Sequence, residues 1–345
     1  MSDAPAAVLA RYGLEGASVT PILTGLIHRT YRVEGARGAR FALQQVSPIF
    51  ARGVQQDIAR VTAHLAAKGV TTPELVHTSD GALDVEHDGQ IWRLLTWIDG
   101  ETIERVSDPG DARVAASLLG RFHASLADLQ HRFVARRLGV HDTVKHLSAL
   151  RAGLDAHAGH RLLPEVRAIA HEIFDRTAVL PDLSACPERV VHGDPKISNV
   201  IFVPGRRAAR AMVDLDTVGP MQLPLELGDA LRSWCNPLGE DASDVRFDVD
   251  VFAAAIAGYA GAARGFISPG EIALLVPITG LIMLELSARF ALDALNERYF
   301  GWNAERFRTR GDHNLLRARG QLALARDFAT HQSTAERVVV STFHP

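Results

Sequence analysis

Residues 189–216 read RVVHGDPKISNVIFVPGRRAARAMVDLD, and this stretch decides the fold. Short β-branched runs at 190–191 and 200–203 flank a polar loop, and a third apolar run at 211–213 follows a basic turn. Apolar runs separated by turn residues predict strand, loop, strand, turn and strand. Since the loop is short and the third strand folds back beside it, we expect acid and amide groups from the loop and the last strand to gather at one edge.

Three side chains at this edge are suited to phosphoryl transfer. Asp194 and Asn199 lie five residues apart, so a tight loop can direct both into one cleft, and Asp214 follows the partner strand. One carboxylate can orient a hydroxyl and take its proton, while the other carboxylate and the amide oxygen can hold Mg²⁺. For Asp or Asn alone, a solvated turn that caps backbone groups is the better interpretation. The complete set, with strands around it, favours phosphoryl transfer.

The spacing of these residues adds a second indication. The pattern H-x-D-x-x-x-x-N is the catalytic-loop signature of protein-kinase-like folds, and here it reads His192, Asp194 and Asn199. Asp214 lies where the metal-binding aspartate of the following hairpin belongs. The spacing therefore predicts a kinase-like catalytic loop rather than an isolated pair of polar residues.

Composition limits the class of protein. The chain has 345 residues, 47% of them apolar, which suits one large or two modest domains with real cores. The net charge is −3, so we expect no nucleic-acid or anionic-membrane surface. Cys186 and Cys235 fit a reduced cytosol better than a disulfide scaffold. The histidines show no zinc spacing, and we predict no zinc site.

We expect a cytoplasmic protein that does not enter the membrane. Met1 to Gly16 contains Asp3 and lacks an apolar segment, so no secretory signal is predicted. The most apolar run, Ile272 to Leu284, contains Pro277 and is too short to span a bilayer. A buried core helix is therefore the better interpretation of this run.

Element patterns divide the chain at residues 98 and 99. Residues 1–98 predict a small α+β lobe of about one hundred residues, and residues 99–345 predict a larger and mostly helical lobe. The expected elements of the small lobe are a helix at 5–12, strands at 17–23, 30–34 and 40–46, a helix at 54–68, and strands near 82–86 and 91–97. The expected later helices begin near 108 and include 142–157, 164–179, 226–234, 245–263, 269–295 and 312–330.

Two parts of the small lobe could bind a nucleotide. Gly25, in the first strand-strand turn, would let backbone N–H groups approach a phosphate, although an ordinary hairpin is the alternative. The segment 94–98 would link the lobes, where an adenine could pair with backbone groups, and a plain edge strand is the alternative. The candidate nucleotide-binding residues are Gly25, His28, Thr30, Gln44, Thr96 and Ile98.

These motifs resemble a known family. VVHGDPKISNVIF, followed by MVDLDTVGP and LELGDALRSWCNP, resembles the aminoglycoside phosphotransferase and choline kinase superfamily, and most closely its N-acetylhexosamine 1-kinase group. GLIHRTY, FALQQVSPIF, WRLLTWIDG, RFALDALNERYF and HNLLRARGQLAL support the resemblance, which covers roughly residues 19 to 328. It implies a bilobal α+β fold with a small antiparallel-sheet N-lobe, one main N-lobe helix, and a mostly helical C-lobe.

The resemblance also implies roles for single residues. Asp194 is the implied catalytic base, and Lys196 resembles the lysine that faces the transferring phosphoryl group. Asn199 and Asp214 are implied Mg²⁺ ligands, and Asp216 is expected to help hold the metal's water shell. Further implied roles are loop bracing by His192 and Asp229 and sugar contacts by Arg232 and Arg289.

One departure from the kinase pattern concerns the third strand. Kinases place a lysine there, paired with a helix glutamate, but this strand reads Phe41-Ala42-Leu43-Gln44-Gln45, and the following helix offers Asp57 in a roughly equivalent place. Gln44 can donate a hydrogen bond to a phosphate but supplies no charge. Either His28, Arg29 or Lys196 supplies the missing charge, or nucleotide binding is weak. The N-acetylhexosamine kinase group resembles this chain in having LQ there, which favours an active enzyme.

The expected reaction is transfer of the γ-phosphate of ATP, with Mg²⁺, to the anomeric hydroxyl of an N-acetylhexosamine such as GlcNAc or GalNAc. The C-terminal part mixes arginines at 289, 298, 306, 308 and 310 with acids, which does not suggest a trap for cationic substrates. Alternatives are kinases for glucosamine, an aminoglycoside or choline, and a pseudokinase that binds nucleotide without turnover. The expected partners are a nucleotide and a sugar, with the protein a monomer or homodimer.

Overall fold

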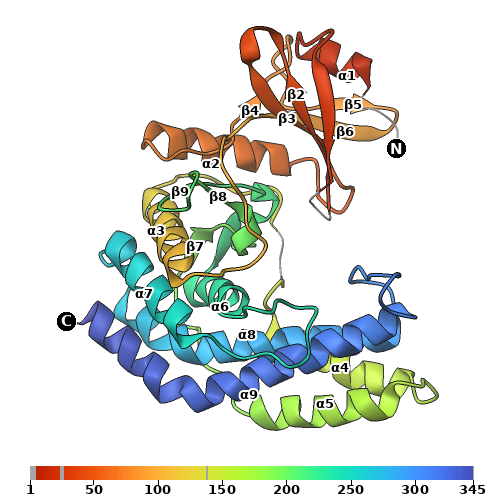
Figure 1. Cartoon of the computed structure of the whole chain (residues 1–345), viewed down its shortest axis with the longest axis vertical. Helices are drawn as coiled ribbons and strands as arrows, with labels where there is room; N and C mark the ends of the chain where they lie inside the picture. The colour runs from red at the N-terminus through yellow and green to blue at the C-terminus, as the bar shows by residue number, and fades with distance from the viewer. Residues whose placement is uncertain (1–4, 24–26, 137–138, 345) are drawn as a thin grey trace.

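An antiparallel sheet forms the N-terminal part of the molecule, and helices dominate the rest (Figure 1). The computed structural model describes residues 5–23, 27–136 and 139–344. This arrangement confirms the predicted α+β fold with a small antiparallel-sheet lobe and a larger, mostly helical lobe.

The sheet is six-stranded, in the order β1-β2-β3-β6-β4, with β5 pairing to β6. All pairs are antiparallel, and Gln44 lies opposite Thr30 on one side and Arg93 on the other. The two-residue strand β4 was not predicted. The strands are β1 (Ser18–Ile22), β2 (Arg29–Glu34), β3 (Arg40–Gln45), β4 (Leu75–Val76), β5 (Val85–His87) and β6 (Gln90–Thr96).

One face of the sheet has its own small core. Alternate residues of the strands, Val33, Leu43 and Leu94, are fully buried and pack with Val8 of the short helix α1 (Ala6–Arg11). The period-two pattern of apolar residues places these side chains on the same face. The opposite face is left to line the cleft between the two parts of the molecule.

Helix α2 (Val54–Ala67) lies beneath the sheet and packs into the large core of the C-terminal part (Figure 1). Its buried residues Val54, Ile58, Val61 and Leu65 recur at helical spacing, which places them on one stripe. This stripe belongs to the same hydrophobic cluster as the helices of the C-terminal part. The helix therefore connects the sheet to the larger lobe.

The stretch at 189–216 forms parts of two separate two-stranded sheets. Strand β8 (Val200–Phe202) pairs with β9 (Ala209–Met212), as the sequence predicts for neighbouring runs. Strand β7 (Glu188–Val191) instead pairs with β10 (Gly219–Gln222), a strand that was not predicted. The segment 219–222 contains Pro220, which has no N–H to donate to a strand ladder, and a two-stranded sheet tolerates it.

The helices of the C-terminal part match their predicted positions with small shifts at their ends, except the last one. Predicted at 312–330, this helix continues to Phe343, because Ala335, Val339 and Phe343 form a buried stripe that the polar and β-branched residues around them conceal. The helices are α3 (Pro109–Ser125), α4 (Thr143–Ala156), α5 (Leu163–Arg176), α6 (Leu223–Trp234), α7 (Val249–Ala263), α8 (Pro269–Asn296) and α9 (Arg310–Phe343).

Helix α8 is a central helix of the larger lobe. With 28 residues it is long and apolar enough to cross a membrane, but 78% of its most apolar window is buried inside the molecule. Ser268 caps its first turn together with Glu271, and Pro269 takes the first helical position. The apolar run expected to be a core helix is therefore part of one, and the whole helix is longer than the run itself.

Candidate active site

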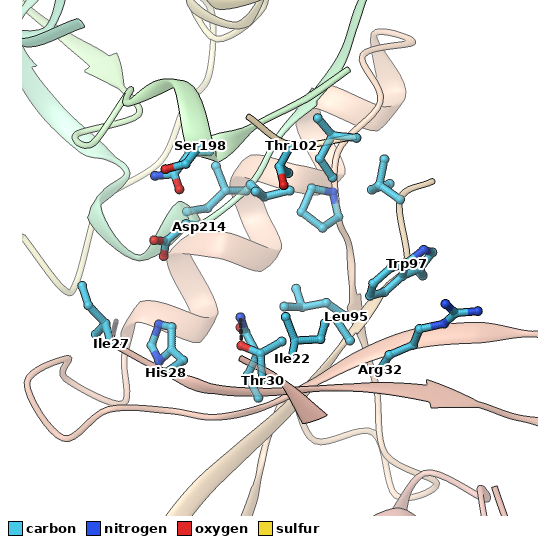
Figure 2. A pocket seen from close by; sticks show the side chains of 18 of the residues that line it. Ile22, Ile27, His28, Thr30, Arg32, Leu95, Trp97, Thr102, Ser198 and Asp214 are labelled. Carbon is cyan, nitrogen blue, oxygen red and sulfur yellow. Dashed lines mark hydrogen bonds between the residues drawn. The ribbon is translucent and has the colours of Figure 1, made fainter. Parts of the chain in front are cut away.

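A cavity of about 730 Å³ lies between the sheet and the hairpins of the C-terminal part. Its size is in the range of small-molecule and nucleotide sites. Figure 2 shows Asp214 and Ser198 on one wall, with Thr30 of β2 and His28, just before that strand, opposite them and Trp97 at the far end. The candidate residues that line it are His28, Thr30, Gln44, Thr96, Ile98, Lys196, Asn199 and Asp214.

The polar loop between β7 and β8 brings its functional side chains together through its own hydrogen bonds. Asn199 donates from Nδ2 to the backbone oxygen of Asp194 at 2.9 Å, which leaves the Asn199 amide oxygen free of that bond. Lys196 donates from Nζ to Oδ2 of Asp194 at 2.8 Å. Burial alone would lower the pKa of Lys196, but the charge and hydrogen bond of Asp194 raise it. Asp194 and Lys196 thus form an ion pair, and Lys196 lines the cavity whereas Asp194 does not.

The backbone of this loop is held by buried groups behind it. Both oxygens of Glu226, on α6, accept 2.9 Å hydrogen bonds from the backbone N–H groups of His192 and Gly193. The His192 ring donates from Nε2 to the oxygen of Val213 at 2.9 Å, which ties the loop to the end of β9. His192 therefore lies where its predicted bracing role needs it.

Asp229 was predicted to brace the same loop, but the structure places it elsewhere. It accepts hydrogen bonds from Arg232 at 3.0 and 2.9 Å, one turn along α6. The bracing carboxylate is instead Glu226, which is 1% exposed. A glutamate on a helix after the motif carries no local signature of this role, so the sequence alone did not indicate Glu226.

Asp214 lies in a tight backbone turn at the cavity. Its φ of 66° is left-handed, a conformation that non-glycine residues rarely adopt and that often marks functional sites. Burial, followed by the charges of Asp216 and Asp194, raises the pKa of Asp214. Within the described ranges, no side chain hydrogen-bonds its carboxylate. A half-buried acid with a raised pKa and no hydrogen-bonded partner is chemically suited to a cation.

Asp216, two residues later, is in a different environment. Arg93 donates to both of its oxygens, at 2.7 and 2.5 Å, and His28 lies 3.0 Å from one of them. Burial opposes ionisation, but the Arg93 charge and the hydrogen bonds from His28 and Arg93 hold the pKa of Asp216 well below its usual range. One oxygen of Asp214, one of Asp216 and a ring nitrogen of His28 lie within 4.8 Å of one another. The three could share a cation, although the oxygens of Asp216 are already occupied.

Oxygen donors at this point fit a hard divalent cation. Asp214 offers a carboxylate, and Asn199 offers an amide oxygen on the same cavity wall. The set contains no thiolate, which argues against a soft metal. Asn199 and Asp214 are therefore suited to Mg²⁺, while Asp216 is committed to Arg93.

Arg93, on β6, is the residue that sequence reasoning missed. It is 2% exposed, and besides Asp216 it donates to Gln44 at 2.8 Å and to Gln55 of α2 at 3.3 Å. The sequence did contain a signal, because Arg93 lies within the apolar run WRLL. A charged residue in such a run is expected to be buried only if it has a partner, and none is evident nearby in the sequence. The missing partner could not be found, since Asp216 is 123 residues away.

The acid expected on α2 does not reach the sheet. Asp57 is fully buried, and it accepts hydrogen bonds from the ring of His131 at 2.7 Å and from the backbone of Val134 and Ala135. The prediction that Asp57 takes the place of the kinase helix glutamate is therefore wrong. The α2 residue that contacts Arg93, the buried cation of the sheet, is Gln55.

The remaining nucleotide candidates lie at the sheet side of the cavity. Gln44 donates to the Thr30 hydroxyl at 3.3 Å. The Thr96 hydroxyl accepts from the backbone of Glu74, and Ile98 follows the last strand at the cavity wall. Gly25 lies outside the described residues.

The predicted acceptor residues form a polar cluster on α6 and α8. Arg232 is 6% exposed and donates to Asp229 and to Glu240 at 2.9 Å. The negative charge of Glu240 in turn helps to raise the pKa of Lys196, which connects this cluster to the catalytic loop. Arg289 lies over the ring of Phe300. The positive charge of Arg289 lowers the pKa of Asp229, as does that of His141.

Comparison with known proteins agrees with this geometry. The sequence profile of the phosphotransferase enzyme family matches residues 18–264, which is more than half of the chain. The chain belongs to this family. It is a phosphotransferase of the kinase-like type that acts on small molecules, and its catalytic loop falls inside the matched range.

Solved phosphotransferases share its fold. The chain is similar to an aminoglycoside phosphotransferase from Alicyclobacillus acidocaldarius, with 17% identity, a TM-score of 0.67, and coverage of 99% of this chain and 98% of that one. It is also similar to a choline/ethanolamine kinase family protein from Mesorhizobium loti (17% identity, TM-score 0.59, 96% and 97% covered). A third is the amicoumacin kinase hAmiN in complex with AMP-PNP, Ca²⁺ and Ami (13% identity, TM-score 0.60, 88% and 87% covered). At such identities the likeness establishes the fold.

Proposed function

We propose that this phosphotransferase moves the γ-phosphate of ATP to a sugar hydroxyl, with the anomeric hydroxyl of an N-acetylhexosamine as acceptor. One observation carries the proposal. Asn199 and Asp214 line the same cavity, and Asp194, up to twenty residues away in the sequence, lies directly behind this wall, where it binds Lys196 and Asn199. This constellation supplies a base and two oxygen ligands, as phosphoryl transfer requires.

Asp194 is the proposed base. Its ion pair with Lys196 fixes the carboxylate, and the brace of Glu226 fixes the backbone beneath it. Asp194 orients the acceptor hydroxyl and receives its proton late, because a loose transition state needs little activation of the nucleophile. Lys196, which lines the cavity, offers positive charge to the transferred phosphoryl group.

Asn199 and Asp214 are the proposed ligands of Mg²⁺. When bound, the ion supplies positive charge that neutralises the phosphate oxygens. The raised pKa of Asp214 supports a cation site, since a nearby positive charge would favour the ionised carboxylate and lower this pKa. The amicoumacin kinase complex, which contains AMP-PNP and Ca²⁺, supports a nucleotide and a divalent cation here too.

The division of labour follows the two lobes. We propose that residues 1–98 bind the nucleotide, with the adenine beside the backbone at Thr96 and Ile98, and that residues 99–345 supply catalysis and acceptor binding. Both cysteines are free and buried, which supports a reduced, cytoplasmic setting.

The acceptor cluster favours a neutral polyhydroxylated substrate. Asp229 and Glu240 are both paired with Arg232, and Glu285 accepts from His141 and Thr143. A polycationic drug or choline would need acids without such partners. Paired donors and acceptors suit sugar hydroxyls and an acetamido group instead. Arg232 and Arg289 are the proposed sugar contacts.

An acceptor panel tests this proposal. The protein is incubated with ATP, Mg²⁺ and GlcNAc, GalNAc, glucosamine, choline or kanamycin, and ADP release is measured. We expect release with an N-acetylhexosamine, giving an acid-labile phosphate. Choline or kanamycin as sole acceptor would contradict the sugar assignment, and ATP binding without any turnover would favour a pseudokinase.

Replacing the proposed base gives the matching variant. Asp194→Asn should lower kcat by at least about 10²-fold, because the proton acceptor is lost while the shape is kept. Affinity for an ATP analogue, measured by calorimetry, should stay within about threefold. Retained turnover in this variant would contradict the role of Asp194.

A further inference from the structure

A buried arginine occupies the region where kinases place the lysine of the third strand. Arg93 lies on β6 directly opposite Gln44 of β3, so the cation has moved one strand across the sheet. The residues suggested as substitutes are placed less well. His28 contacts the same Asp216 as Arg93, Lys196 is paired with Asp194, and Arg29 is exposed.

We propose that Arg93 is a positioning residue of the nucleotide site. It turns the amide N–H groups of Gln44 toward the phosphates, and it binds Asp216 in a closed ion pair, so that Asp214 alone of the two aspartates is available to the metal. This inference rests on the proposed function, because it assumes that the cavity takes a nucleoside triphosphate.

The orientation of Gln44 follows from its hydrogen bonds. Its Oε1 accepts from Nε of Arg93 at 2.8 Å, so the oxygen end of the amide points to the interior of the sheet. The Nε2 end is then directed to the Thr30 hydroxyl, at 3.3 Å, and both residues line the cavity. An amide that accepts from a guanidinium becomes a stronger donor at its other end. Arg93 thereby acts on the phosphates through Gln44.

The commitment of Asp216 follows from geometry as well. Both of its oxygens accept from Arg93, and the two side chains are 0% and 2% exposed. A bidentate pair of this kind is rigid and shielded from water. A divalent cation on Asp216 would lie against the guanidinium, which repels it. Asp214 has no such partner within the described residues, and its position at the start of the same turn depends on the anchored Asp216.

The pair also connects the two lobes. Arg93 on β6 and Gln44 on β3 belong to the sheet, whereas Asp216 belongs to the turn after β9. The usual kinase lysine pairs with a helix of its own lobe. Here the counter-ion is in the other lobe, so the same contact that orients Gln44 sets the distance between the nucleotide wall and the metal ligands.

The test separates positioning from simple stability. Arg93→Lys and Arg93→Gln are titrated with AMP-PNP, with and without Mg²⁺, and KM for the acceptor is measured. We expect AMP-PNP affinity to fall at least tenfold in both variants and the Mg²⁺ concentration for half-maximal activity to rise. The acceptor KM should change less than twofold, since the acceptor cluster is on α6 and α8.

Arg189→Lys is the matched control. Arg189 also forms a bidentate pair, with Glu271 at 2.8 and 2.9 Å, but its side chain is only half-buried and it lies on β7 outside the cavity lining. It should lose thermal stability and keep AMP-PNP affinity and Mg²⁺ requirement. If Arg93→Lys behaves like Arg189→Lys, the role is structural and the proposal is overturned.

A second pair of variants keeps the proposal testable if the Arg93 variants do not fold. Gln44→Leu retains Arg93 but removes the N–H donors, and it should weaken AMP-PNP binding in the absence of metal. Asp214→Asn should raise the Mg²⁺ requirement at least tenfold. Native AMP-PNP affinity in Gln44→Leu would overturn the proposal.

Failure of the inference can be told from failure of the proposed function. AMP-PNP titration needs no acceptor, so an unidentified sugar does not affect it. A native protein that binds no AMP-PNP would contradict the proposed function itself, whereas native binding that is unchanged in the Arg93 and Gln44 variants contradicts the inference alone.

Discussion

Gly193 shows how one residue without a side chain shapes the catalytic loop. Its φ is +85°, and a Cβ there would lie 2.3 Å from the backbone oxygen of Thr217. The same residue donates its N–H to Glu226. The glycine is thus required both by the backbone conformation and by the close approach of the turn after β9.

We predict that Gly193→Ala lowers the free energy of unfolding by about 3 kcal/mol or more, because left-handed strain and a backbone clash add. kcat should fall as well, since the bond to Glu226 cannot survive the shift. Chemical denaturation and steady-state kinetics measure the two effects.

Gly205→Ala is the control for this prediction. Gly205 has a φ of +77° but nothing within 4 Å of the added Cβ. It should cost about 1 kcal/mol from strain alone and leave kcat unchanged. Equal losses in the two variants would mean that the clash at Gly193 is relieved without consequence.

At this scale the sequence predicts residue types better than partners. Asp194, Asn199 and Asp214 could be chosen because their spacing constrains them to one loop and its hairpin. Glu226 and Arg93 could not, because each acts through a contact with a residue far along the chain, His192 in one case and Asp216 in the other. Nothing in local spacing distinguishes Glu226 from Asp229 as the brace.

Among the elements, helix α8 depends on a buried acid at its first turn. Glu271 is 0% exposed, completes the cap of Ser268 and accepts two hydrogen bonds from Arg189 of β7. Burial would raise its pKa, but the bonds from Arg189 and Ser268 hold the pKa of Glu271 below its usual value. The ionised form therefore stabilises the folded state.

The predicted pH dependence follows from this direction. The stabilisation is present above the unfolded-state pKa of about 4.3, and it is lost as the pH falls through the lower pKa of the folded state. Glu271→Gln should lower the free energy of unfolding at pH 7 by about 3 kcal/mol. The difference between variant and native protein should shrink below pH 4.3, measured by thermal unfolding. A difference that is constant with pH would contradict the ionic role.

Element boundaries were predictable where a repeating apolar pattern was long and had clear caps, as in α8. Helix α9 was cut short in the prediction because its last third presents only one apolar residue per turn to the core. Strand β10 was missed because Pro220 outweighed its role as the partner of β7. In both cases tertiary packing overrides local preference.

For the molecule as a whole, Asp57 is the clearest link between the lobes besides Arg93. It holds the segment 131–135 of the larger lobe to helix α2. We predict that Asp57→Asn, which places an amide donor against two backbone donors, destabilises the protein by about 3 kcal/mol. Hydrogen exchange at 134 and 135 should accelerate, and AMP-PNP affinity should fall as α2 moves.

Glu86→Gln serves as the comparison for this change. Glu86 pairs with Arg52 on the surface, with both side chains more than half exposed, so its loss should cost less than about 1 kcal/mol. Exchange at 134 and 135 should stay native. Unaltered exchange in Asp57→Asn would show that the apolar stripe of α2 alone fixes the helix.

The bilobal fold could be predicted from one sequence because the catalytic motif restricts the topology around it. The distribution of the hydrophobic core could not be predicted. The apolar stripe of α2 could pack equally well against the small lobe or against the larger lobe that begins after residue 98. Only the structure shows that Val54, Ile58 and Leu65 belong with the helices of the larger lobe.

The placement of α2 has a consequence for any attempt to cut or recombine this chain. A fragment that ends near residue 98 would carry the stripe of α2 without the residues of the larger lobe that complete its cluster, together with a buried Asp57 whose donors are gone. We expect such a fragment to aggregate rather than remain a monomeric nucleotide-binding module. Chimeras with relatives would therefore need to exchange α2 along with α3 and the 131–135 segment, so that the contacts between α2 and the larger lobe are kept.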